Sequence, residues 1–193
     1  MSGFDRAIDD IVMKMERARW IKQLFPNLYG RVERHIRYEK KKKIIVPVLY
    51  AGQGEYMDMR PYDVTNNSWW YVHDNQEVLN GGNSAIVNLK ATVSVVFWYR
   101  LDVDERKTEE VKRNLLYFLN NVPIENATFK AKRVYETPET IFKDFTVESK
   151  NLPYTIHPYA GIRIEGEMVV QSSCYDSMVG KTFNTDYNKQ DYR

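Results

Sequence analysis

The sequence predicts an α+β fold: a mixed, mostly antiparallel sheet flanked by an N-terminal helix and one or two further helices, with an extended C-terminal arm. Three observations support this prediction: helical spacing of apolar residues near the N-terminus, long alternating segments after residue 86, and a polar tail without periodicity. We expect residues 1–174 to form a single domain and residues 175–193 to form the arm.

The N-terminal helix is predicted over about residues 4–24. Phe4, Ile8, Ile11 and Met15 recur at helical spacing, and acidic residues cluster in its first half, where the helix dipole favours negative charge. The helix either packs on its own sheet or docks on a neighbouring subunit.

Three short strands are predicted next, one of which ends at Pro61. Residues 44–50 (IIVPVLY) show no alternation, which indicates a strand covered on both faces or at an interface, and Pro47 indicates an edge or a bulge. Residues 69–73 (WWYVH) are another short strand, followed by a turn-rich loop over residues 74–84.

Residues 86–101 give the clearest strand, with apolar side chains alternating along most of it. Because this strand exceeds the usual length, we expect it to extend beyond the sheet or to bend. Strands are also predicted over residues 127–136 and 159–173. In the last of these, Arg163, Glu165 and Glu167 share one face, which indicates a solvated sheet face or ion pairs between subunits.

Two further helices are predicted. Residues 107–121 carry an apolar stripe behind Thr108 as the N-cap, and Pro123 follows the end of the helix. A short helix begins at Pro138 after the cap residue Thr137.

Composition places the chain among globular proteins. It has 193 residues, 43% hydrophobic and 28% charged, with 14 Tyr and 4 Trp. Such aromatic content fits either a tyrosine-rich β domain or a protein rich in interfaces. Residues 1–43 carry a net charge of +6 and the remaining residues −4. This uneven charge distribution suits a subunit that stacks on copies of itself or on partners, or that faces DNA with one surface.

Cys174 is the only cysteine, which excludes a disulfide within the chain and indicates a reducing compartment. No apolar run is long enough to cross a membrane, and the first ten residues lack the apolar core of a secretory signal. We therefore expect synthesis in a cytoplasm and no membrane partner.

Motifs for catalysis or metal binding are missing from the sequence. His35, His73 and His157 are isolated, and no zinc-ligand spacing, nucleophile elbow or phosphate-binding loop is present. We expect no metal, no cofactor and no enzymatic activity. The one enzymatic alternative is Cys174 with His157 and Asp176.

Residues 31–43 carry seven basic and two acidic side chains. The candidate contact residues are Arg34, Arg37, Lys40, Lys41, Lys42 and Lys43. Three interpretations remain open: a solvated lip that prevents edge-to-edge aggregation, contact with an acidic partner, or contact with DNA phosphates.

Four segments together suggest a family: residues 4–32, 88–101 (NLKATVSVVFWYRL), 108–122 (TEEVKRNLLYFLNNV) and 159–170 (YAGIRIEGEMVV). In layout the chain resembles the neck and tail ring proteins of tailed bacteriophages, of the tail-terminator or head-tail connector type, including the neck rings of crAss-like phages. The resemblance implies a non-enzymatic virion subunit that forms a homo-oligomeric ring around a DNA channel, between portal and tail.

From this resemblance we expect contacts with identical subunits, with adjoining neck, portal or tail proteins, and with channel DNA at the lysine run. The expected intersubunit residues are aromatic: Trp69, Trp70, Trp98, Tyr175, Phe183, Tyr187 and Tyr192. The alternative is a small nucleic-acid-binding protein that uses the basic segment 31–43.

Overall fold

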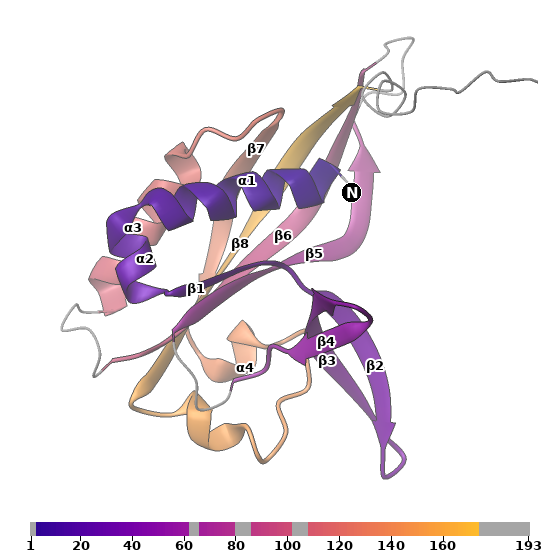
Figure 1. Cartoon of the computed structure of the whole chain (residues 1–193), viewed down its shortest axis with the longest axis vertical. Helices are drawn as coiled ribbons and strands as arrows, with labels where there is room; N and C mark the ends of the chain where they lie inside the picture. The colour runs from indigo at the N-terminus through magenta and orange to yellow at the C-terminus, as the bar shows by residue number, and fades with distance from the viewer. Residues whose placement is uncertain (1–2, 62–65, 80–85, 102–107, 174–193) are drawn as a thin grey trace, which may run out of the picture.

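The computed structural model describes residues 3–61, 66–79, 86–101 and 108–173 (Figure 1). The expected arm, 175–193, lies outside these residues. The helices are α1 (Gly3–Arg17), α2 (Arg19–Leu24), α3 (Thr108–Asn121), α4 (Pro138–Ile141) and the 3-10 turn η1 (Leu152–Thr155). The strands are β1 (Asn27–Arg31), β2 (Glu33–Glu39), β3 (Lys42–Gly52), β4 (Glu55–Asp58), β5 (Asn67–Val78), β6 (Ile86–Arg100), β7 (Ala127–Tyr135) and β8 (Tyr159–Ser173).

The main sheet has five strands in the order β1-β5-β6-β8-β7. Only β1 and β5 pair in parallel, so the predicted mixed and mostly antiparallel sheet is confirmed. β6 and β8 pair from Ile86↔Ser173 to Arg100↔Tyr159. Of the two alternatives predicted for the long strand, extension beyond the sheet is therefore wrong, because β8 has the same length and pairs with β6 from end to end. The other alternative, a bend, stays a prediction.

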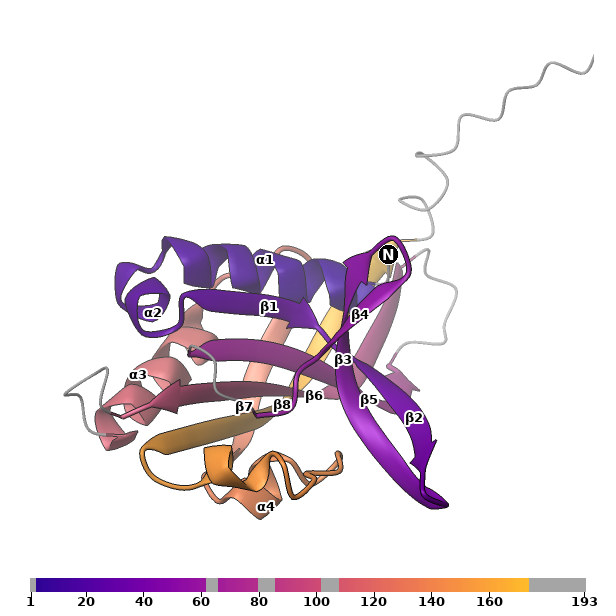
Figure 2. The ribbon, with the colours of Figure 1, turned by 60° about the horizontal axis from the view of Figure 1, so that its bottom comes forward.

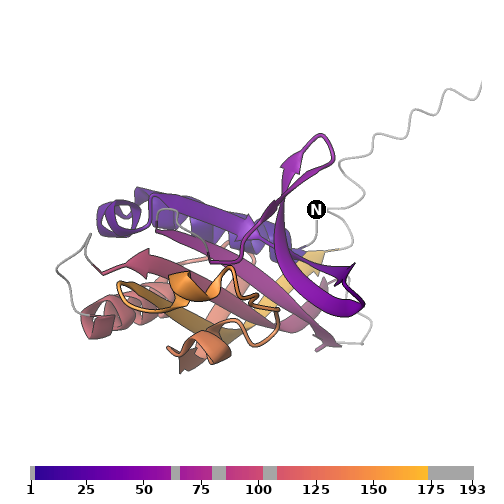
Figure 3. The ribbon, with the colours of Figure 1, turned by 90° about the horizontal axis from the view of Figure 1, so that it is seen from below.

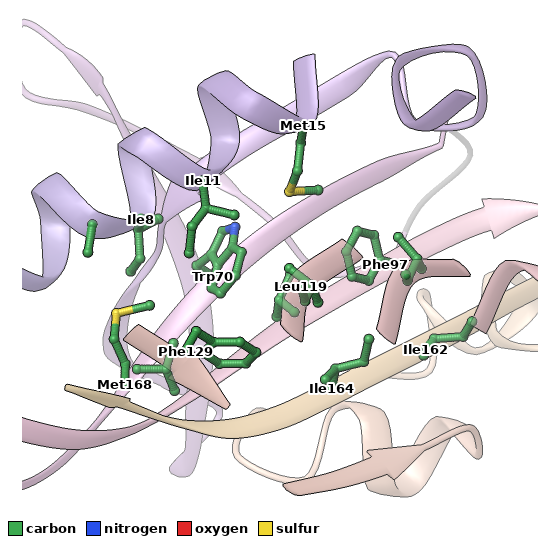
Figure 4. Packing of buried hydrophobic residues seen from close by; sticks show 14 of the residues in the cluster. Ile8, Ile11, Met15, Trp70, Phe97, Leu119, Phe129, Ile162, Ile164 and Met168 are labelled. Carbon is green, nitrogen blue, oxygen red and sulfur yellow. The ribbon is translucent and has the colours of Figure 1, made fainter. Parts of the chain in front are cut away.

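Helices α1, α2 and α3 cover one face of this sheet (Figures 1 and 4). Ile8, Ile11 and Met15 of α1 and Leu119 of α3 are buried there against Phe97 and other apolar side chains of the strands. The opposite face is covered at one end by α4 and the chain that follows it (Figure 2). The main sheet is thus the middle of three layers over part of its length.

The predicted N-terminal helix is divided into two at Ala18, whose backbone is extended (φ −77°, ψ 97°). At about 100° per residue, Leu24 on a continuous helix would point away from the face that carries Ile8 and Met15. The break turns the second helix so that Ile21 and Leu24 are also buried in the core. Burial of these side chains outweighs the high helix propensity of alanine.

Residues 74–78, predicted as part of a loop, continue β5. After an irregularity between Val72 and Gln76, Glu77 pairs with Lys90 and Val78 with Leu89 on β6. The length of β6 thus provides a partner for residues whose own composition indicates a turn.

A second sheet, which the sequence did not predict, has the order β2-β3-β4 (Figure 3). β3 is its central strand, so the edge position inferred from Pro47 is wrong. Met59 N donates to Pro47 O at 2.9 Å, but Pro47 has no N–H with which to complete the pair. The β3–β4 ladder ends at this position, which explains how a central strand accommodates proline.

Candidate functional site

The basic segment forms a β-hairpin that reaches beyond the main sheet (Figures 1 and 2). Glu39 pairs with Lys42, which leaves Lys40 and Lys41 as a two-residue turn with φ of 47° and 66°. Positive φ at both central positions is the geometry of a type I′ turn, which favours Asn and Gly. The turn geometry therefore does not explain why lysines occupy it.

The basic side chains of the hairpin are exposed, from Arg34 and Arg37 on β2 to Lys40–Lys43 at the turn. Arg34 lies 3.8 Å from the carboxylate of Asp74, which is itself 83% exposed. Within the described part of the chain, Arg37 and the four lysines form no ion pair. The tip of the hairpin therefore presents positive charge that nearby carboxylates do not neutralise.

Two large apolar side chains are exposed on the same hairpin. Ile36 and Tyr38 are 52% and 73% exposed, and their spacing of two residues puts them on one face of β2. β2 is also an edge strand, with β3 on one side only. Exposed apolar side chains beside an open strand edge are a template for contact with another chain.

The base of the hairpin is fixed to the body by the chain that follows α4. Ile45 lies on the part of β3 that has no partner on β4. There Ile45 N donates to Thr146 Oγ1 at 3.0 Å, and Thr146 N donates to Ile45 O at 2.8 Å. Asn151 Nδ2 donates to Pro61 O at 2.9 Å. The buried guanidinium of Arg60 joins Asp58 at the end of β4 to Glu148.

The tryptophans expected at a subunit interface lie in the core instead. Trp69, Trp70 and Trp98 are 1%, 0% and 3% exposed, so no ring surface remains for a neighbour, and this prediction is wrong. Gly161 of β8 makes room for Trp98, since a Cβ there would lie 2.4 Å from the ring. The other expected contacts, Tyr175, Phe183, Tyr187 and Tyr192, lie outside the described residues.

Sequence reasoning also missed a buried polar cluster around Arg163 of β8, whose side chain is 1% exposed. Its guanidinium lies 2.5 Å from the carboxylate of Asp144 and donates to Ile141 O at 3.2 Å. It also donates to Ser94 Oγ at 3.1 Å and to Glu165 Oε2 at 3.2 Å. Arg163 thus links the main sheet to α4 and to the chain after it.

Two neighbours complete the cluster. His73 Nε2 lies 3.2 Å from the Arg163 guanidinium and 2.9 Å from Ser94 Oγ. Lys143 Nζ donates to Glu165 Oε2 at 2.9 Å and lies 4.5 Å from the centre of the Tyr135 ring. Arg163 and Glu165 were expected on a solvated face or in ion pairs between subunits. Both are buried, which contradicts a solvated face, and the ion pairs that they form lie within the chain. The sequence did contain one indication that this face is buried. Ile141, Phe142 and Phe145 are apolar, and they can be buried only by packing on a second face of the sheet.

Burial and neighbouring charges set the ionisation of this cluster. Burial lowers the pKa of His73; the negative charge of Asp144 opposes this effect and the positive charge of Arg163 adds to it. Burial alone would raise the pKa of Glu165, but the hydrogen bond from Lys143 and the charges of Lys143 and Arg163 hold it below its usual value. The cluster therefore favours a neutral histidine beside an ionised glutamate. This arrangement holds the covering segment, defined as α4 and residues 142–151, on the sheet.

The proposed cysteine site is only partly described. His157 is exposed, whereas Cys174 and Asp176 lie outside the described residues, so their grouping stays a prediction. Among the residues that the structure describes, no group of three or more His, Cys, Asp or Glu side chains could hold a metal ion. The same residues contain no helix that is long and apolar enough to cross a membrane.

No protein-family model matches the chain, and no curated protein matches its sequence.

The depressed pKa of His73 predicts a pH dependence of stability. Because the unfolded chain takes up this proton at higher pH than the folded chain, the free energy of unfolding should fall as the pH drops below about 6.5. Gln keeps an acceptor for Arg163 but does not titrate, so His73→Gln should flatten this part of the profile. Urea unfolding between pH 7.5 and pH 5 measures the effect.

His157→Gln is the matched control, because that side chain is exposed and lies outside the cluster. It should leave the slope of the wild-type profile intact. A His73→Gln profile as steep as that of the wild type would show that the cluster does not cause the pH dependence.

Proposed function

We propose that the protein is a non-enzymatic structural subunit of a viral neck or tail ring, which joins portal to tail around the DNA channel. It would act in the virion, after synthesis in the cytoplasm of a bacterial host. Its partners would be copies of itself and the adjoining neck, portal or tail proteins. The layout of the four sequence segments described above supports this proposal.

The projecting hairpin is the observation that carries it. Ile36 and Tyr38 stay exposed on an edge strand, while the hydrogen bonds between Ile45 and Thr146 and the ion pairs of Arg60 hold the base of the hairpin in place. A fixed, projecting element with exposed apolar side chains suits a contact between subunits, because little order has to be gained on binding.

The lysines at the tip of the hairpin, Lys40–Lys43, would orient this contact. Positive charge that the described residues of the subunit do not neutralise would be attracted to an acidic face of an adjoining ring or to the phosphates of channel DNA. In either case the charge would steer and orient the contact, while the apolar side chains behind it would supply most of the binding free energy.

The second candidate function is nucleic-acid binding by segment 31–43. The same exposed charge favours it, because phosphate contacts supply most of the affinity of non-specific DNA binding. Aromatic side chains are few near the tip, where Tyr38 is the main one, so stacking on bases would contribute little.

Assembly is tested by light scattering, with micrographs of the same sample. The wild type should form a discrete large oligomer or rings, and the double change Ile36→Ser with Tyr38→Ser should weaken association. Burial of one such side chain contributes about 1.5–3 kcal/mol, so the association constant should fall at least about tenfold.

Leu152→Ser is the control, since Leu152 is 53% exposed but lies on η1 rather than on the hairpin. An oligomer of unchanged size and affinity in the double variant would contradict the role of the hairpin. A monomer at every concentration would favour the nucleic-acid alternative.

DNA contact is tested by changing Lys40–Lys43 to Gln and measuring affinity for duplex DNA as a function of salt. If all four lysines contact phosphates, the slope of log K against log salt should become shallower by about 3.6, from about 0.9 per contact. The control changes four exposed lysines away from the hairpin: Lys22, Lys130, Lys132 and Lys150. Equal losses in both variants would show that net charge, and not the hairpin, is responsible.

A further inference from the structure

An apolar groove lies between the C-terminal ends of α1 and α3, on the helical side of the main sheet. It has a volume of about 690 Å³, and its lining includes Trp20, Tyr117, Phe118, Val122 and Pro123. Lys14 crosses one side and donates to Pro123 O at 2.6 Å. The amides of Asn114 and Asn121 contribute polar groups to the lining.

The aromatic residues of the groove are incompletely covered. Tyr117 is 73% exposed, and Trp20 and Phe118 are only half-buried, although both pack against the main core. The other three tryptophans of the chain are almost fully buried. A groove that leaves this much aromatic surface in water is a candidate for a docking site.

The C-terminal segment follows β8, which ends beside the start of α1, where a Cβ on Gly3 would lie 3.2 Å from Val170. The groove lies at the other end of that helix. Gln171 N, near the end of β8, donates to Asn126 O at 2.8 Å, and Asn126 is only three residues beyond Pro123 of the groove. Twenty residues, 174–193, follow β8. Ten residues of extended chain span about 33 Å, more than the length of about 22 Å expected for a helix of the size of α1. The segment is therefore long enough to reach every part of the groove.

We propose that the groove is the docking site for the C-terminal segment of the same chain, with Phe183 as the residue that fills it. Phe183 is the only phenylalanine in residues 174–193, and its ring brings no polar atom that would need a partner inside an apolar groove. The flanking residues Thr182 and Asn184 are polar and suit a rim that carries amide groups.

Docking within one chain is favoured over docking between chains. A short connection within one chain gives an effective concentration in the millimolar range, which exceeds the concentration of neighbouring chains in dilute solution. The segment would cover Trp20 and Phe118 and so protect an apolar patch from non-specific association. This proposal does not depend on the ring function, because it concerns the free subunit.

Trp20 reports on the groove directly, because the other three tryptophans are buried. In the full chain, acrylamide should quench little of the tryptophan emission. Phe183→Ala should raise the quenchable fraction to about one quarter, since one of the four rings becomes accessible. Tyr192→Ala is the matched control within the segment and should leave quenching as in the wild type.

A second comparison assigns the signal to the groove. In a Trp20→Phe background, Phe183→Ala should change nothing. Equal quenching of the wild type and the Phe183→Ala variant would overturn the proposal. Docking within one chain is independent of protein concentration. If the protection of Trp20 disappeared when the protein was diluted from about 100 μM to about 1 μM, docking within the chain would be overturned. The groove would then bind the C-terminal segment of a neighbouring chain.

Discussion

The buried guanidinium of Arg163 is the interaction on which the arrangement of the second face depends. From the middle of β8 it contacts Ser94 on β6 and reaches Ile141 and Asp144 on the covering segment. That segment in turn is hydrogen-bonded to Ile45 of β3 through Thr146. One buried side chain thus connects the main sheet to the base of the basic hairpin.

A buried charge of this kind is expensive to desolvate, and it is stable only when its hydrogen-bonding groups are satisfied. Asp144 and Glu165 supply the opposite charge, and Ser94 and Ile141 O accept further hydrogen bonds. An apolar side chain could fill the same space, but it would not select one position of the covering segment. We infer that the cluster specifies where the segment, and therefore the hairpin, is held.

Much of the main layer could be predicted from the sequence. Helical spacing predicted α1 and α3, because each of these helices buries one face. Alternation predicted β6, β7 and β8, because every second side chain of these strands packs under the helices. The fold class followed from the same patterns. The break at Ala18 could not be predicted, since alanine favours a helix and only the burial of Ile21 and Leu24 explains the change of direction.

The site was harder to predict than the fold. The exposed lysine run was visible in the sequence, but β2 has few buried side chains and so shows no apolar alternation that would indicate a strand. Trp69, Trp70 and Trp98 were assigned to an interface because aromatic residues are enriched at interfaces. In the structure their large rings fill the space between the sheet and the layers that cover its two faces. Burial of Arg163 depends on Ile141 and Asp144, which lie 22 and 19 residues before it in the sequence, and local patterns do not record such contacts.

The most direct test of this account is native-state hydrogen exchange on an Arg163→Met variant. The account predicts that protection falls first at the amides of Ile45 and Thr146, which join the hairpin base to the covering segment. The amides that pair β6 with β8 should keep protection close to the global free energy of unfolding. Loss of protection that is uniform across the main sheet, with no earlier opening at Ile45 and Thr146, would contradict the claim that Arg163 holds the hairpin through this segment.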